Sequence, residues 1–130
     1  KKTISIPVIL TGGFRTRSAM ESAIGNNACE MIGVGRPLCA DPLSIKKLLN
    51  GEIGQLSRYE KSLSFGPWIF SPSSPFRLIQ AINGFGAQAW FYQQIKRISL
   101  NEDPDLSMSV FAALRKDLAE DLTAVKALKG

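Results

Sequence analysis

Histidine is absent from this chain of 130 residues. The chain therefore cannot by itself form a Ser-His-Asp triad, a histidine metal site or an imidazole acid–base catalyst. Cysteine is scarce, and we expect the two that are present, Cys29 and Cys39, to be reduced and to serve as small apolar side chains. We predict no metal site and no disulfide from these residues.

Long apolar runs and blocks of like charge are also missing. No stretch approaches the ~20 apolar residues that span a membrane, and Pro7 interrupts the apolar start too early for a secretory signal. We therefore expect no membrane association and a cytosolic (cytoplasmic) location. The net charge is +5, but the 16 Lys and Arg residues are interspersed with 11 acidic residues, so nucleic-acid binding is not predicted.

Two glycine-rich turns are the most informative feature that is present. TGGF at residues 11–14 follows the apolar run ISIPVIL at residues 4–10, and GVGRP at residues 33–37 overlaps a second short run at residues 31–34. Short runs rich in β-branched residues and ended by glycine predict strands, and we expect the first to be buried.

A helix is predicted between the two strands. Ser18 stands three residues before Glu21, as in a capping box, and Gly25 can close the helix in the left-handed conformation. A strand, a helix and a second strand in this short span favour a parallel pair joined by a right-handed crossover. Parallel strands end at the same edge of a sheet, so we expect the two glycine turns to lie side by side.

The rest of the chain predicts helices and one ordered loop. Asp41 followed by Pro42 predicts the start of a helix that ends at Gly51. Residues 54–74 are irregular and aromatic, and we expect a loop whose Phe65, Trp68, Ile69 and Phe70 are buried. Two helices are expected near 87–99 and 108–128, the second capped by Asp105 or Ser107.

The residues best suited to chemistry are Gly12, Gly13, Gly35 and Arg36. Glycine turns at the ends of adjacent parallel strands expose backbone N–H groups, and an arginine fork can bridge phosphate oxygens, so this group predicts a phosphate site. The alternative is that each turn is only a tight turn. We expect Arg15 and Arg17 to be solvated.

Other candidates have simpler structural explanations. The aromatic set Trp68, Trp90, Phe91 and Tyr92 could form a flavin or base platform, but aromatics at helical spacing favour a core. Asp41 is expected to be a helix cap rather than a catalytic carboxylate. We therefore assign no catalytic residue.

Residues 6–53 resemble the carboxyl-terminal part of the old yellow enzyme family, or NADH:flavin oxidoreductases, especially its fungal members. The resemblance is carried by IPVILTGGFRTRSAMESAI and ACEMIGVGRPLCADPLSIKKLLNGEI. It implies an α/β fold that is the last two βα units of an FMN-containing (β/α)8 TIM barrel, followed by extra helices. It also implies that Gly12, Gly13, Gly35 and Arg36 hold the FMN phosphate.

The resemblance further implies hydride transfer from NAD(P)H through FMN to an electron-poor alkene or quinone-like acceptor. The family's substrate-anchoring His-His or His-Asn pair and its proton-donating Tyr have no match here, and we do not assign that role to Tyr59 or Tyr92. We therefore expect a fragment that is inactive as an isolated chain. Residues 1–53 would form the phosphate cradle and residues 54–130 a loop and helical region.

Two alternatives are kept open. The chain could be a noncatalytic α/β module that binds phosphorylated ligands or a partner protein through its aromatic, helical region. It could also be a fragment of another FMN barrel, such as a hydroxy-acid oxidase or a dihydroorotate dehydrogenase.

Overall fold

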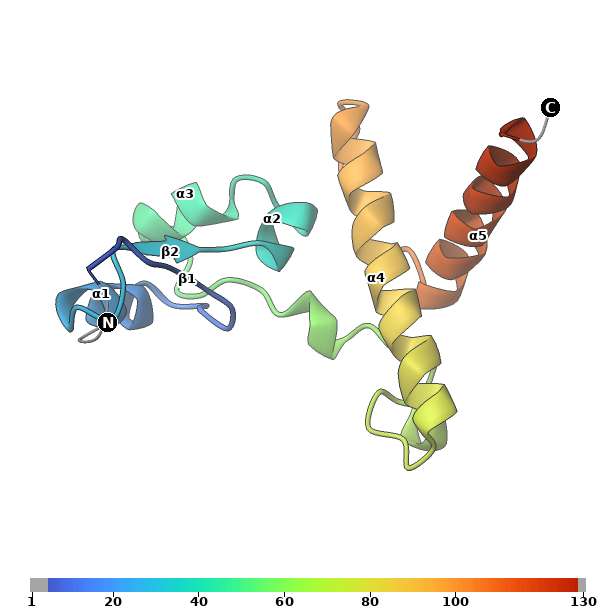
Figure 1. Cartoon of the computed structure of the whole chain (residues 1–130), viewed down its shortest axis with the longest axis horizontal. Helices are drawn as coiled ribbons and strands as arrows, with labels where there is room; N and C mark the ends of the chain where they lie inside the picture. The colour runs from blue at the N-terminus through green and yellow to red at the C-terminus, as the bar shows by residue number, and fades with distance from the viewer. Residues whose placement is uncertain (1–4, 129–130) are drawn as a thin grey trace. The chain divides into compact units, whose positions relative to one another are not determined.

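The computed structural model describes residues 5–128, and the chain divides into two compact units (Figure 1). Unit 1 is Lys1–Arg58 and unit 2 is Tyr59–Gly130. The sequence placed this division five residues earlier, after residue 53. In the part of the chain that the structure describes, no helix combines the length and the apolar character needed to cross a membrane.

Unit 1 contains a two-stranded parallel sheet, as the sequence predicts. Strand β1 (Ile9–Thr11) is followed by helix α1 (Arg17–Gly25) and strand β2 (Met31–Gly33). Ile9 pairs with Met31 and Thr11 with Gly33. The helical crossover therefore joins neighbouring parallel strands and brings both strand ends to one edge.

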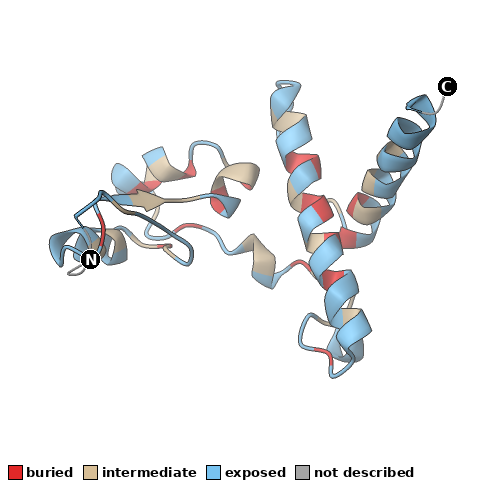
Figure 2. Ribbon diagram, in the orientation of Figure 1, coloured by how far each residue is buried: buried red, intermediate tan, exposed pale blue. Residues whose placement is uncertain are grey.

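Strand β1 is shorter and more exposed than predicted. Residues 5–8 are not strand, although the Val8 carbonyl accepts hydrogen bonds from the N–H groups of Glu30 and Met31. Proline lacks an N–H donor, which accounts for the missing ladder around Pro7, and residue 4 lies outside the described residues. The expectation of a buried strand is wrong, because Ile9 is 60% exposed and all of β1 is exposed (Figure 2).

Helix α1 begins and ends with different caps from those predicted. The Thr16 hydroxyl accepts from the Ala19 N–H, so Ser18 and Glu21 do not form the expected capping box. The left-handed residue after the helix is Asn27, with φ +54°, and not Gly25. Asparagine tolerates this conformation better than most residues, so it can end a helix as glycine does.

A short helix precedes the helix that was predicted after Asp41. Helix α2 (Arg36–Ala40) begins directly after Gly35, and helix α3 spans Ser44–Leu49. Asp41 ends α2, and its carboxylate accepts from the Leu43 N–H at 3.1 Å, so Asp41 caps a turn instead of starting a helix at Pro42. The predicted end of α3 is confirmed, because Gly51 has φ +76° and closes the helix.

Unit 2 consists of two 3₁₀ turns and two long helices. The turns are η1 (Tyr59–Lys61) and η2 (Trp68–Phe70), and the helices are α4 (Arg77–Ser99) and α5 (Val110–Ala127). Helix α4 begins ten residues before the predicted start at residue 87. The predicted caps of α5 are wrong, because the Ser109 hydroxyl accepts from the Ala112 N–H, while Asp105 accepts from Ser107 in the preceding turn.

Trp90 lies at the centre of unit 2. It is 1% exposed, its ring stacks on Tyr59 at 5.9 Å between centroids, and its Nε1–H donates to the Met108 carbonyl at 2.9 Å. The prediction of a core role is confirmed for Trp90. It is wrong for Trp68, which is 88% exposed at the start of η2, where Ile69 and Phe70 are also exposed.

Candidate functional site

The four residues predicted to bind a phosphate line one pocket in unit 1. The pocket has a volume of about 330 Å³, at the lower end of the range for small-molecule sites. Its walls come from the last residues of β1 and β2 and the segments that follow them, and the lining residues are Thr11, Gly12, Gly13, Phe14, Arg15, Gly33, Val34, Gly35 and Arg36. The structure therefore brings Gly12, Gly13, Gly35 and Arg36 together, and their role in binding stays a prediction.

The glycines of the first turn are required by the backbone. Gly12 has φ +103° and Gly13 has φ +77°, which residues with a Cβ rarely adopt. Apart from the two residues that flank each glycine, no heavy atom of residues 5–128 lies within 4 Å of a Cβ built on Gly12, Gly13 or Gly35. The surface beside these backbone groups is therefore open, so a ligand can approach the main chain without meeting a side chain.

Gly33 keeps the two turns close together. It lies opposite Thr11 in the sheet, and a Cβ at this position would come 3.3 Å from the Thr11 Cβ and closer still to its methyl group. A larger residue would push the ends of the two strands apart. Gly33 is the first glycine of GVGRP, and its role was not predicted because local sequence does not reveal its neighbour across the sheet.

Two arginines line the pocket, and they are held differently. Arg36 is the first residue of α2, is exposed, and has no recorded hydrogen bond or ion pair within residues 5–128. Arg15 is 9% exposed, its Nη1 donates to the Phe14 carbonyl at 2.8 Å, and its own carbonyl accepts from the Leu56 N–H at 2.7 Å. The expectation that Arg15 is solvated is wrong.

Arg17 lies outside the pocket. Its Nε donates to Glu21 at 2.6 Å and its Nη1 to the Leu49 carbonyl at 3.0 Å, so it links α1 to the end of α3. The pocket lining thus has two guanidinium groups and no carboxylate. This composition favours an anion over a cation or a neutral ligand.

Within residues 5–128 the pocket is accompanied by no cysteine in its lining and by no metal cluster. Cys29 and Cys39 are both free, as expected, and burial raises the pKa of the Cys39 thiol, which disfavours the reactive thiolate. Asp41 pairs with Lys47 at 2.8 Å besides capping its turn. Within residues 5–128 no group of three or more Cys, Asp or Glu is arranged to hold a metal ion.

Parts of the chain are similar to curated flavin oxidoreductases. NADH-dependent flavin oxidoreductase iliE of Hypocrea jecorina (strain QM6a) is 37% identical over 67 residues, which is 49% of this chain and 16% of that protein. NADH-dependent flavin oxidoreductase iccE of Talaromyces variabilis is 30% identical over 98 residues, or 73% of this chain and 23% of that protein. The chain resembles part of a flavin oxidoreductase.

A bacterial protein gives a third match. Bilirubin reductase of Mediterraneibacter gnavus (strain CC55_001C) is 44% identical over 52 residues, which is 40% of this chain and 8% of that protein. The chain thus spans less than a quarter of the length of each of these three relatives. No family model and no solved structure matches the chain. The resemblance to flavin oxidoreductases is confirmed, and the old yellow enzyme assignment stays a prediction.

Proposed function

We propose that unit 1 binds the phosphate end of FMN in an NAD(P)H-dependent flavin oxidoreductase. The observation that carries this proposal is the pocket where two glycine turns meet beside Arg15 and Arg36, with no carboxylate in its lining. The partial similarity to proteins named NADH-dependent flavin oxidoreductases supports a flavin over other phosphorylated ligands. On this proposal β1, α1, β2 and the short helices after them are the last two βα units of a (β/α)8 barrel.

The residues of the pocket suit a phosphate group. Backbone N–H groups in glycine turns can approach phosphate oxygens closely, because the open space beside Gly12, Gly13 and Gly35 would take the ligand. The Arg36 fork can bridge two oxygens and has no competing partner recorded within residues 5–128. The Arg15 side chain is buried and donates to the Phe14 carbonyl, so its position is restricted before a ligand arrives.

A bound flavin would supply the hydride chemistry between NAD(P)H and an electron-poor alkene or quinone-like acceptor. The chain's own part in this proposal is to hold the phosphate and thereby fix one end of the cofactor. Anchoring a remote, unreactive group in this way provides binding energy that positions the reacting ring. The flavin ring, the acceptor and the proton donor are outside the proposal for this chain.

The proposal can be tested by titrating the ¹⁵N-labelled chain with inorganic phosphate, FMN and riboflavin. We expect phosphate and FMN to shift the amide signals of Gly12, Gly13 and Gly35, and riboflavin, which lacks the phosphate, to leave them unchanged. Arg36→Ala should weaken FMN binding by about 1.5–3 kcal/mol, the range for a charged hydrogen bond.

Arg58→Ala is the matched control, because Arg58 is an exposed arginine of the same unit that does not line the pocket. Equal loss in the two variants would show a general charge effect and would contradict the proposal. Binding of ribose 5-phosphate as tightly as FMN would favour the noncatalytic phosphate-binding module instead. Far-UV circular dichroism of each variant checks that the fold is kept.

We also expect the 130-residue chain, given FMN and NADH without oxygen, to reduce an activated alkene no faster than free FMN. The pocket is an open surface beside exposed strands and offers contacts for the phosphate end only. Turnover above the free-flavin control that persists after size-exclusion chromatography would show a catalytic site elsewhere in the chain.

A further inference from the structure

Helices α4 and α5 of unit 2 form an apolar groove that the proposed flavin site does not use. The groove has a volume of about 550 Å³. The helices approach where Val110 packs against Gly86, and their axes diverge from there in Figure 1. The lining residues are Ile82, Phe85, Gln88, Ala89, Tyr92, Leu114, Asp117, Leu118 and Asp121.

Much of the apolar lining is exposed to solvent. Phe85 is 65% exposed, Leu118 is 54% exposed, and Tyr92, which also lines the groove, is exposed as well. Large apolar side chains gathered in one groove are a feature of interaction surfaces, whereas single exposed apolar residues are ordinary. The groove therefore has the form of a docking surface for an apolar stripe.

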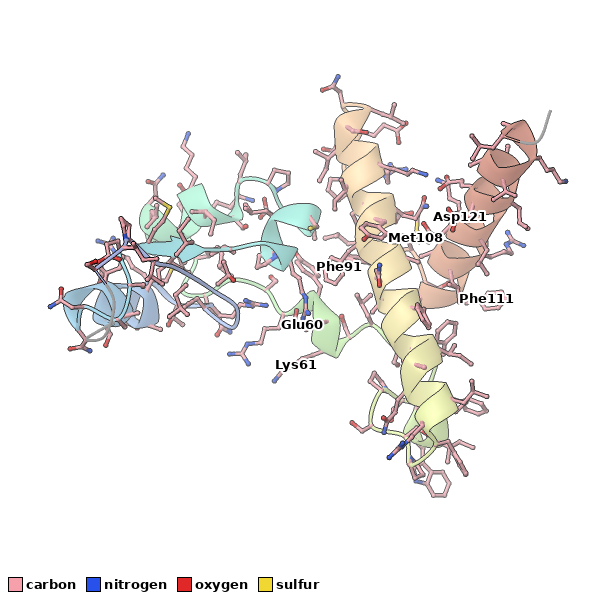
Figure 3. All side chains as sticks on the ribbon, in the orientation of Figure 1. Glu60, Lys61, Phe91, Met108, Phe111 and Asp121 are labelled. Carbon is pink, nitrogen blue, oxygen red and sulfur yellow. The ribbon has the colours of Figure 1, made fainter. Side chains whose placement is uncertain are left out.

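The polar part of the groove is acidic. Asp117 and Asp121 lie one turn apart on α5, and Asp121 is labelled in Figure 3. The lining contains no Lys or Arg, and within residues 5–128 neither carboxylate has a recorded hydrogen bond or ion pair. The neighbouring Glu120 differs, because it is engaged by Gln93 and Lys96 outside the groove. The chain as a whole carries a net charge of +5, so this lining contrasts with its overall charge.

We propose that this groove binds an amphipathic helix of a partner protein whose apolar face is flanked by Lys or Arg. A helix laid in a groove is a recurrent mode of recognition, with apolar anchors at helical spacing. Lysine and arginine stems cover apolar surface while their charged ends reach carboxylates such as Asp117 and Asp121. The proposal does not depend on the flavin site.

A second copy of the chain fits the groove less well. In a twofold dimer the same patch of each copy forms the interface, so four carboxylates, Asp117 and Asp121 of both copies, would enter one interface whose lining has no Lys or Arg to offset them. Like charges brought together at an interface are unfavourable. A basic partner removes this repulsion and supplies the cations that the groove lacks.

The test uses two labelled peptides about four helical turns long. One has Leu on one face and Lys on the other, and its match carries Glu in place of every Lys. Fluorescence anisotropy with the full chain should show the Lys peptide binding at least about tenfold more tightly, with an affinity that falls as salt is added. Equal affinity for the two peptides would overturn the proposal.

Variants locate the binding on the groove. The pair Asp117→Asn and Asp121→Asn together should remove most of the preference for the Lys peptide and flatten its salt dependence. Asp103→Asn removes a charge from an exposed residue outside the groove and should leave the affinity within about twofold. Phe85→Ala should weaken both peptides, and Phe76→Ala, an exposed phenylalanine outside the groove, is its control.

Two results contradict the proposal even if some peptide binds. One is unchanged affinity after Asp117 and Asp121 are both neutralised. The other is a concentration-dependent dimer in sedimentation experiments that excludes the Lys peptide, because the occupant of the groove would then be a second copy. All these substitutions are on exposed or half-exposed positions, and circular dichroism verifies that the helices are retained.

Discussion

The glycines of the unit 1 turns and Gly86 of unit 2 serve opposite purposes. In unit 1, Gly12, Gly13 and Gly51 have positive φ, and beyond their flanking residues nothing in the described part of the chain lies within 4 Å of a Cβ built on any of them. In unit 2, Gly86 lies inside α4, where a Cβ would come 2.6 Å from the Phe65 ring and would also clash with Val110. The first group sets the direction of the backbone, and Gly86 allows close packing.

The units also differ in what their central feature depends on. Unit 1 leaves all of β1 exposed, and its first glycine turn depends on backbone conformation, whereas Trp90 of unit 2 is buried, stacks on Tyr59 and donates to the Met108 carbonyl. The core of unit 2 therefore depends on contacts between residues that are distant in sequence. Substitutions should separate dependence on backbone conformation from dependence on long-range packing.

The largest effect is expected for Trp90→Ala. This substitution removes a buried ring, its stack on Tyr59 and its hydrogen bond to Met108, and should cost about 3–5 kcal/mol. Urea unfolding followed by far-UV circular dichroism measures the loss. Trp68→Ala is the control, and because Trp68 is exposed its change should stay within about 0.5 kcal/mol. Similar losses in both variants would contradict the assignment of the core.

Alanine substitutions at two glycines of α4 should change the stability of unit 2 in opposite directions. Gly86→Ala forces a Cβ against Phe65 and Val110 and should destabilise unit 2 by about 1–3 kcal/mol. Gly84→Ala meets open space and should stabilise α4 by roughly 0.5–1 kcal/mol, because alanine favours helix more than glycine does. Thermal unfolding of the two variants gives the comparison, and a shift of the same sign in both would count against it.

In unit 1 the backbone conformation of a glycine should determine how much stability its replacement by alanine costs. Gly12→Ala meets no neighbour but places a Cβ on a residue with φ +103°, which should cost about 1–3 kcal/mol. Gly25→Ala, in the last turn of α1, also meets no neighbour and lacks the positive φ, so it should be neutral or stabilising. Hydrogen exchange of the β1 and β2 amides measures both, and equal behaviour would show that the turn does not need glycine.

The smallest expected effect is the loss of stability at acid pH from the ion pair of Glu120 and Lys96. Lys96 donates to the Glu120 carboxylate and, with Gln93, holds the pKa of Glu120 below its ordinary value. The stability from this lowered pKa is present above the ordinary value of about 4.3 and is lost as the pH falls through the lowered one. Because both groups are partly exposed, we expect less than about 1 kcal/mol.

Glu120→Gln and Lys96→Gln, alone and combined, test this in urea unfolding between neutral and acid pH. Each single variant should have a lower free energy of unfolding than the wild type near neutral pH, and the difference should shrink in acid. The double variant should lose no more stability than the sum of the two single losses. Stability curves that run parallel over the whole pH range would show that the Glu120 pair does not contribute.

The sequence predicted the parts of the fold that depend on local signals. The parallel pair, the crossover helix and the meeting of Gly12, Gly13, Gly35 and Arg36 followed from short apolar runs and glycine turns. The burial of β1 was predicted wrongly, because an apolar run does not state whether another element covers it. The exposure of Arg15 was predicted wrongly, because the fold brings segments distant in sequence beside it, as the bond from the Leu56 N–H to the Arg15 carbonyl shows.

Helix α4 shows why local sequence signals do not predict packing between distant segments. The sequence predicted a helix near 87–99, yet α4 begins at Arg77 and runs through Gly84 and Gly86. Gly86 is accommodated because Phe65 and Val110 occupy the space that a side chain would take, and both belong to segments outside α4. Likewise, Ser109 caps α5, where Asp105 or Ser107 were equally plausible from their residue types.

The aromatic residues also give the two units different optical properties. Residues 1–58 contain no tryptophan or tyrosine, so absorbance and emission excited near 295 nm come from Trp68 and Trp90 in unit 2. Iodide should quench exposed Trp68 and leave buried Trp90 emitting. Unit 1 has almost no chromophore of its own, and a flavin at the glycine turns would be its first strong one. Because the chain itself does not absorb visible light, binding there can be followed as a change in the visible absorbance of the flavin.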